Sequence, residues 1–239
     1  HCWFDRSGAG DFRHFLVPFD QQRHALQGRG AVGLPSANHD FQRPRVGDRD
    51  IDDLRVILTF LLSWPGVPFI YYGDEIGMRF LELPSKEGGY QRTGTRTPMQ
   101  WNRGPNAGFS SAAPEQLHLP VDPAPDRPDV ASQRADPASL WRQVRALIRL
   151  RREEPALAAS ASLQLLSSGA HLPLVFVREQ EGARLLVALS PAAGEAVFEL
   201  PPDCLPRESL VVHRARLEAG AGTARLLLDG PAAGIWRLA

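Results

Sequence analysis

Two short apolar runs separated by one amphipathic stretch constrain the fold of this chain more than any other feature. Residues 31–36 and 67–72 are almost continuously apolar rather than alternating, which is typical of parallel strands covered on both faces. Between them, Asp50 can cap a helix and Pro65-Gly66 can end it. The buried face of that helix would carry Ile51, Leu54, Leu58, Leu61 and Leu62. The pattern predicts a strand–helix–strand unit with parallel strands.

Polar residues follow each predicted strand. Asn38-His39-Asp40 comes after the first strand and Asp74-Glu75 comes after the second. Loops at the carboxyl ends of parallel strands converge, and active sites form there both in closed barrels and in open doubly wound sheets. We therefore expect a functional site at the carboxyl ends of the two strands. A closed barrel and an open doubly wound sheet both fit this pattern.

The rest of the chain divides into a long loop, a helix and a β-rich region. Residues 79–135 are irregular, and loops of this length in compact proteins are commonly functional. A helix is predicted from Asp136-Pro137 to Pro155, and from about Ser160 short apolar runs alternate with turn residues. The runs predicted as strands of an antiparallel sandwich are 172–178, 184–190, 196–200, 209–213, 223–228 and 234–238. The predicted domains are residues 1–157 and 158–239.

The composition argues against several classes of protein. The 239 residues carry 27 Lys and Arg against 27 Asp and Glu, so the chain lacks the basic excess that binds nucleic acid. No run of about 18 apolar residues is present, which argues against a membrane span. Cys2 and Cys204 are expected to be unpaired thiols. The first residue is His rather than Met and no basic and apolar leader follows it, so we do not expect the chain to begin where its gene begins. A cytoplasmic location is expected, and the Arg-, Ala- and Pro-rich usage is typical of a GC-rich bacterial gene.

The Asn38-His39-Asp40 tripeptide has the chemistry of a sugar site. A carboxylate accepts hydrogen bonds from sugar hydroxyls, an imidazole can donate one, and the pair can stabilise the positive charge of an oxocarbenium-like transition state. The alternative is a simple turn, because Asn and Asp are frequent turn residues. A metal site is disfavoured, because no third or fourth ligand lies nearby in the sequence.

Other candidates lie at the second strand end and in the long loop. Asp74 and Glu75 are adjacent, so their side chains point in different directions, and we expect them to brace the loop. An indole packs on the apolar face of a sugar and a guanidinium donates to its hydroxyls, so the loop could bind sugar or could simply pack on itself. The loop residues with this chemistry are Tyr90, Arg92, Arg96, Trp101 and Phe109.

Three motifs, in this order, resemble the alpha-amylase superfamily, glycoside hydrolase family 13. Ala37-Asn38-His39-Asp40 is similar to the fourth conserved region, and Gly66 to Met78 is similar to the eighth barrel strand and its turn. Arg96-Thr97-Pro98-Met99-Gln100-Trp101, followed by Asn106-Ala107-Gly108-Phe109, resembles a loop of the alpha-glucosidase, oligo-1,6-glucosidase and trehalose synthase branch.

The resemblance implies a fold, an activity and a set of site residues. Residues 31–157 would be the last strands and helices of a (β/α)8 TIM barrel, and residues 158–239 a C-terminal β-sandwich domain. The reaction would be retaining cleavage or transfer at α-glucosidic bonds of an α-glucoside or oligosaccharide. Asp40 would be the carboxylate that stabilises the transition state, and Glu75 would be structural. The expected substrate-binding residues are Asn38, His39, Arg43 and Arg96. No cofactor is expected, and the usual calcium ligands of the family would lie upstream.

The chain departs from the family at its beginning. The family's nucleophilic Asp and acid/base Glu follow the fourth and fifth barrel strands, and only 37 residues precede Asn38. A closed barrel needs eight strands and typically about 250 residues, and the pattern shows two such strands. We therefore interpret the chain as the C-terminal part of an enzyme whose N-terminal half of the barrel is the missing partner. The alternatives are a non-catalytic carbohydrate-binding or assembly module and a structural remnant.

Overall fold

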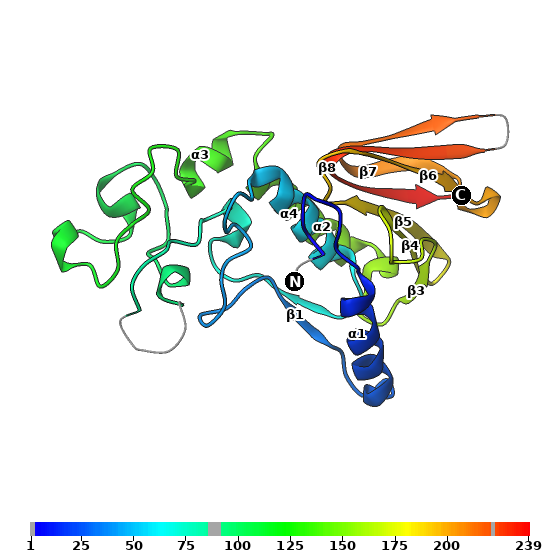
Figure 1. The fold of residues 1–239 in the computed structure, drawn as a ribbon, viewed down its shortest axis with the longest axis horizontal. Coiled ribbons are helices and arrows are strands. Elements are labelled where there is room, and N and C mark those ends of the chain that lie inside the picture. The colour runs from blue at the N-terminus through cyan, green and yellow to red at the C-terminus, as the bar shows by residue number, and fades with distance from the viewer. Residues whose placement is uncertain (1–2, 86–91, 221–222) are drawn as a thin grey trace. The chain divides into compact units, whose positions relative to one another are not determined.

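The structure is a computed structural model that describes residues 3–85, 92–220 and 223–239 (Figure 1). The chain forms two compact units. The first contains His1–Leu34, Arg55–Pro68 and Ala146–Ala239, and the second contains Pro35–Leu54 and Phe69–Arg145. The predicted boundary between residues 157 and 158 stays a prediction, although every strand of the C-terminal sheet follows it.

The predicted strand–helix–strand unit is confirmed. It consists of β1 (Gly33–Pro35), α2 (Ile51–Ser63) and β2 (Val67–Phe69). The amide of Val67 donates to the carbonyl of Val32, and the amide of Ser36 donates to that of Phe69, so the two strands run in the same direction. At Gly66, φ is +105° and a Cβ would lie 2.5 Å from the Val32 carbonyl oxygen, so this turn requires glycine.

The predicted cap of α2 is also confirmed. The Asp50 carboxylate accepts from the amide of Asp52 at 2.8 Å, and the Asp53 carboxylate accepts from the amide of Asp50 at 2.7 Å. These reciprocal bonds satisfy amides that have no partner within the helix.

The prediction that both strands are buried on both faces is wrong. Val67 is 41% exposed and Phe69 is 58% exposed. The physical reason is that β1 and β2 make up a sheet of only two strands among the described residues, so one layer of apolar side chains has no covering layer. This part of the chain has the element order of a parallel barrel without its closure.

The second predicted helix begins later than expected. The structure has α3 (Val130–Ala135), which Asp129 caps by accepting from the Ser132 amide at 2.8 Å, and then α4 (Leu140–Glu153). Asp136 does not cap α4, because its carboxylate accepts from the amide of Ala138 in a turn.

The C-terminal region forms one antiparallel sheet of six strands (Figure 1). The strands are β3 (Ser162–Leu165), β4 (Leu174–Gln180), β5 (Ala183–Ser190), β6 (Glu195–Leu200), β7 (Pro206–Ala219) and β8 (Ala224–Leu238). Their order is β3-β4-β5-β8-β6, and β7 pairs with β8.

The long strand β8 includes two runs that the sequence predicts as separate strands. The runs predicted at 223–228 and 234–238 are its two halves, of which the first pairs with β6 and the second with β5. β7 pairs with both halves of β8. The register of this pairing shifts between His213 and Ala215, and on β8 the shift falls near Gly230, which has a φ of +76°. Side chains of both halves, including Leu226 and Trp236, share one core. A shared core is what a sandwich requires, but the strands form one hydrogen-bonded sheet rather than two.

An aromatic cluster around Trp64 is the core of the helical part of the first unit. The surrounding rings belong to Phe12, Phe15, Phe19, Phe60 and Phe176, with centroids 5.1 to 5.8 Å from that of Trp64. Most of these contacts are edge-to-face, the arrangement that aromatic quadrupoles favour. The scattered aromatics of the first thirty residues therefore pack α1 (Arg13–Leu26) onto the end of α2.

Two arginines bind the carboxyl end of α2. Arg151 comes from α4, and Arg178 comes from β4 and is fully buried. Their acceptors are the carbonyls of Leu62, Trp64 and Gly66 for Arg151, and of Ser63, Ala158, Ala161 and Ser162 for Arg178. The last carbonyls of a helix lack partners and form the negative end of its dipole, so both arginines stabilise this terminus. Among the residues that the structure describes, no helix has the length and apolarity that crossing a bilayer requires.

Replacing Phe12 should test the aromatic cluster. Phe12 is buried, and its ring meets those of Trp3, Phe15, Phe60 and Trp64. Phe12→Ala should lower the free energy of unfolding by about 3–5 kcal/mol, because it removes apolar contacts and leaves a cavity. Denaturant unfolding followed by circular dichroism measures this change. Val17→Ala, at an exposed position of α1, is the control and should change stability by less than about 1 kcal/mol. Equal decreases in the free energy of unfolding of the two variants would contradict the role of the aromatic cluster in stability.

Candidate functional site

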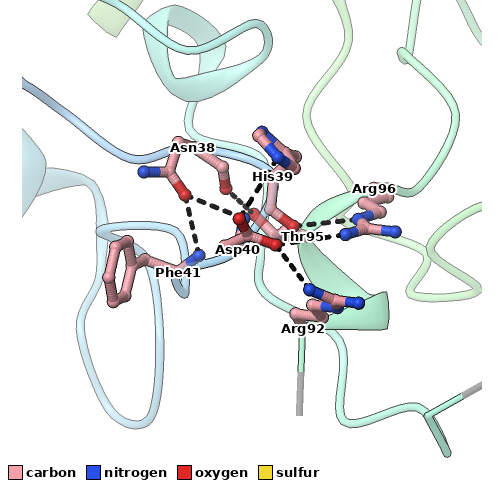
Figure 2. A network of polar contacts seen from close by, with 7 residues as sticks. All are labelled: Asn38, His39, Asp40, Phe41, Arg92, Thr95 and Arg96. Carbon is pink, nitrogen blue, oxygen red and sulfur yellow. Dashed lines mark hydrogen bonds and ion pairs between the residues drawn. The ribbon is translucent and has the colours of Figure 1, made fainter. Parts of the chain in front are cut away.

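Asp40 is the centre of a polar network at the edge predicted for the site (Figure 2). Its Oδ1 accepts from Arg92 Nη1 at 2.8 Å and from Arg96 Nη2 at 3.3 Å. Its Oδ2 lies 3.2 Å from His39 Nε2. The Asp40 side chain is 30% exposed and that of His39 is 68% exposed, so both remain accessible. The structure thus brings together three of the predicted site residues, Asp40, His39 and Arg96.

Asn38 shapes the backbone on which Asp40 is presented. Its Oδ1 accepts from the amides of Asp40 at 2.8 Å and Phe41 at 3.0 Å, the geometry of an Asx turn. Across the turn, Thr95 Oγ1 donates to the Asn38 carbonyl and Arg96 Nε donates to the His39 carbonyl. Asn38 is therefore a turn residue, as the alternative interpretation has it, and the turn itself positions the His–Asp pair.

Arg43, predicted to bind substrate, lies out of reach of a ligand. Its side chain is 0% exposed, and Nη1 donates to Asp74 Oδ1 at 2.8 Å. Nη1 also donates to the carbonyl of Tyr72, and Nη2 donates to the carbonyl of Thr95. The guanidinium also lies over the rings of Tyr71 and Tyr72, with Cζ 4.9 and 4.7 Å from their centroids. The expectation of substrate contact is corrected, because these buried partners occupy the guanidinium.

Asp74 completes this buried pair. Ser36 Oγ donates to Asp74 Oδ2 at 2.6 Å, and the amide of Tyr71 donates to Ser36 Oγ. Burial raises the pKa of Asp74 from 3.8 to about 6, while Arg43 and Ser36 act in the opposite direction. The bracing role expected for Asp74 is confirmed, since its carboxylate joins the ends of the two strands to Arg43.

An open pocket of about 450 Å³ lies against Arg96 in the second unit. Two aromatic rings in its lining are half exposed, Trp101 at 49% and Phe109 at 51%. The other lining residues are Tyr72, Glu75, Arg96, Thr97, Pro98, Met99, Leu117, His118 and Leu119.

Glu75 contributes to the lining of this pocket and carries a carboxyl group that is largely buried. Its Oε2 is buried and has no hydrogen-bond partner among the described residues, and burial raises the pKa of this carboxyl.

Sequence reasoning undervalued two contributors to the site. Arg92, one of several loop candidates, makes the shorter of the two arginine contacts with Asp40. Its signal was its place four residues before Arg96 in the same loop. His118 is not among the candidates named from the sequence, and it lines the pocket. Tyr90 and Cys2 lie outside the described residues. Within the ranges that the structure covers, no group of three or more His, Cys, Asp or Glu side chains could hold a metal ion.

Comparison with known proteins identifies the family. The family model described as "Alpha amylase, catalytic domain" matches residues 11–160. The chain therefore belongs to the alpha-amylase family, and the match lies within its catalytic domain. The resemblance seen in the three sequence motifs is confirmed.

Curated relatives fall in the branch that the long loop predicts. The trehalose synthase/amylase TreS of Mycobacterium tuberculosis (strain CDC 1551 / Oshkosh) is 37% identical over 139 residues, which cover 56% of this chain and 22% of that protein. The oligo-1,6-glucosidase of Parageobacillus thermoglucosidasius is 28% identical over 211 residues, covering 74% of this chain and 37% of that protein. The chain thus spans well under two thirds of these relatives.

Solved structures share the fold of most of the chain. The trehalulose synthase MutB from Pseudomonas mesoacidophila MX-45 matches with a TM-score of 0.80 and 25% identity, covering 94% of this chain and 46% of that one. The MutB E254Q mutant in complex with the substrate sucrose matches with a TM-score of 0.81 and the same coverage.

The raised pKa of Asp74 predicts how this carboxyl changes stability with pH. Between 3.8 and about 6 the native protein binds the proton more tightly than the unfolded chain does, so the contribution to the free energy of unfolding should fall as pH rises through this window. Denaturant unfolding of the native protein and of Asp74→Asn at several pH values measures the contribution as a difference. A difference that does not change with pH would contradict this assignment.

Asp126→Asn is the control, because the pKa of Asp126 is shifted in the opposite direction from that of Asp74. A hydrogen bond from Arg79 lowers the pKa of Asp126. The contribution of Asp126 should therefore be present above its unfolded pKa and be lost as pH falls through the lowered value.

Proposed function

We propose that this chain forms part of a retaining enzyme that cleaves or rearranges α-glucosidic bonds, with Asp40 as the carboxylate that stabilises the transition state. The observation that carries the proposal is the accessible carboxylate of Asp40, held by Arg92 and Arg96 after the first strand of a parallel pair. Membership in the alpha-amylase family and the named activities of the relatives support it.

The two oxygens of Asp40 have different surroundings. Oδ1 accepts from both arginines, which fix the orientation of the carboxylate. Among the residues that the structure describes, Oδ2 has the exposed imidazole of His39 as a polar neighbour, so this oxygen is available to a sugar hydroxyl. As positive charge develops on the sugar ring, a carboxylate held in place in advance stabilises it without rearranging. His39 and Arg96 would donate to hydroxyls of the same ring.

The pocket beside Arg96 supports binding of a second ring. Aromatic faces bind the apolar face of a pyranose, and Trp101 and Phe109 present such faces in a volume of about 450 Å³. The substrate class that fits is an α-linked disaccharide or longer oligosaccharide.

The nucleophile and the acid/base residue would come from the other part of the barrel. Retaining cleavage needs two carboxyls about 5 Å apart, on opposite sides of the bond. Coverage of 46% of the MutB chain supports the inference that the other half is a further part of the same enzyme or a partner chain. A bacterial source is supported by the organisms of the relatives, and the cytoplasmic location stays a prediction.

Replacing Asp40 tests its role. In an enzyme that contains these residues within a complete barrel, Asp40→Asn should lower kcat by about a hundredfold or more and change KM much less, because its contact tightens in the transition state. Steady-state kinetics with maltose measures both constants. The exposed Asp48→Asn is the control and should leave kcat unchanged. A loss confined to KM would reject the role of Asp40 in the transition state and assign it to substrate binding alone.

Removing Trp101 tests the second-ring pocket. In the same enzyme, Trp101→Ala should weaken maltose binding about three- to tenfold, the size expected for one lost aromatic contact, and leave glucose binding unchanged. Calorimetric titration with both sugars measures the difference. Phe41→Ala removes an exposed ring that points away from Asp40 and should affect neither sugar (Figure 2). Equal weakening for glucose and maltose would contradict a second-ring contact.

A further inference from the structure

The short helical turn Thr93–Thr95 lies between the two arginines that hold Asp40. Arg92 comes just before the turn and Arg96 just after it, and both donate to Oδ1 of Asp40 (Figure 2). The amide of Thr95 donates to the carbonyl of Arg92 at 3.1 Å, which closes the turn. The position of this one turn therefore determines where both guanidinium groups meet the carboxylate.

A close backbone contact fixes one side of the turn. A Cβ on Gly94 would overlap the carbonyl oxygen of Leu81, so glycine is required for the two backbones to lie this close. The amide of Leu81 donates to the carbonyl of Gly94 at 3.3 Å. This contact holds the turn against the segment around Leu81, and a different contact is needed to set its position relative to Asp40.

Thr95 supplies that contact. It is fully buried, and its Oγ1 donates to the carbonyl of Asn38 at 3.2 Å (Figure 2). Its own carbonyl accepts from Arg43 Nη2 at 3.0 Å. Asn38 is also the residue whose side chain accepts from the Asp40 amide and so shapes the turn that presents the carboxylate. The Thr95 hydroxyl thus joins the backbone that carries the arginines to the backbone that carries Asp40.

We propose that Thr95 is a positioning residue that acts on the reaction through Asp40, an inference that rests on the role proposed above for Asp40. Because Thr95 is fully buried, a sugar has no access to its hydroxyl. The hydroxyl instead keeps the arginine pair and the carboxylate in register. A small displacement of a charged group that is oriented in advance weakens its stabilisation of the transition state more than it weakens binding of the substrate.

Two substitutions at Thr95 test the hydroxyl itself. In the enzyme with a complete barrel, Thr95→Val keeps the size and branching of the side chain and removes the donor. It should lower kcat for maltose about tenfold and change KM by less than about twofold. Thr95→Ser retains the hydroxyl and should keep kcat within about threefold of the native value. Steady-state kinetics measures both constants. Equal losses of kcat in the two variants would overturn the proposal, because the hydroxyl would then not be responsible.

Thr59→Val is the matched control, because it removes a buried hydroxyl of the same kind away from the site. Thr59 is fully buried, and its Oγ1 donates to the carbonyl of Arg55 at 2.7 Å within α2. This variant should leave kcat unchanged, and the thermal midpoint of each variant shows whether it is folded. If Thr59→Val lowers kcat as much as Thr95→Val does, the effect is a general one of losing a buried hydrogen bond and the proposal is rejected.

A double variant shows whether Thr95 acts through Asp40. In the Asp40→Asn enzyme, adding Thr95→Val should lower kcat no further, because the carboxylate that the hydroxyl positions is gone. A further tenfold loss in the double variant would contradict this coupling and overturn the proposal. If Asp40→Asn lowers kcat and Thr95→Val alone does not, the positioning role is rejected and the proposed function stands. Native kcat in Asp40→Asn would reject both.

Discussion

Arg43 and Asp74 form a buried ion pair on which the geometry of the candidate site depends. Arg43 comes from the segment just after Asp40, and Asp74 follows the second strand. The same guanidinium binds the carbonyl of Thr95, which lies between the two arginines that hold Asp40. One side chain therefore joins the Asn38–Asp40 turn, the second strand end and the long loop. Removing either partner of such a pair leaves an uncompensated buried charge, so the three segments are fixed together.

The order of helices and strands in the N-terminal part could be predicted, because the sequence signal for each element lies within that element or next to it. Apolar runs, helical spacing and the carboxylates of Asp50 and Asp53 act between residues close in sequence, and the strand–helix–strand unit follows from them. The site could be predicted in outline for a similar reason. Asn38 makes its turn with Asp40 and Phe41, so the presentation of the carboxylate is encoded within four residues.

The burial of Arg43, the arginine contacts with Asp40 and the continuity of β8 could not be predicted, because each depends on residues that are distant in the sequence. Arg43 has the chemistry of a ligand-binding residue, and only contacts with Tyr72, Asp74 and Thr95 show that it is buried. Arg92 and Arg96 have equal chemistry in the sequence, and folding alone shows that both reach Asp40. The polar and glycine-containing stretch around Gly230 indicates a turn between two strands, yet both halves continue as β8 because β7 pairs along its length.

The sharing of β8 by both halves of the C-terminal sheet has a consequence for the order of folding. β4 and β5 are neighbours in the sequence and pair with each other, and so do β7 and β8, so each pair forms at low entropic cost. β5 meets β8 only after a separation of more than forty residues, and that closure costs more entropy. We expect the two hairpins to form first and independently. The core around Trp236 is then completed in a single late docking step, because β8 belongs to both halves of the sheet.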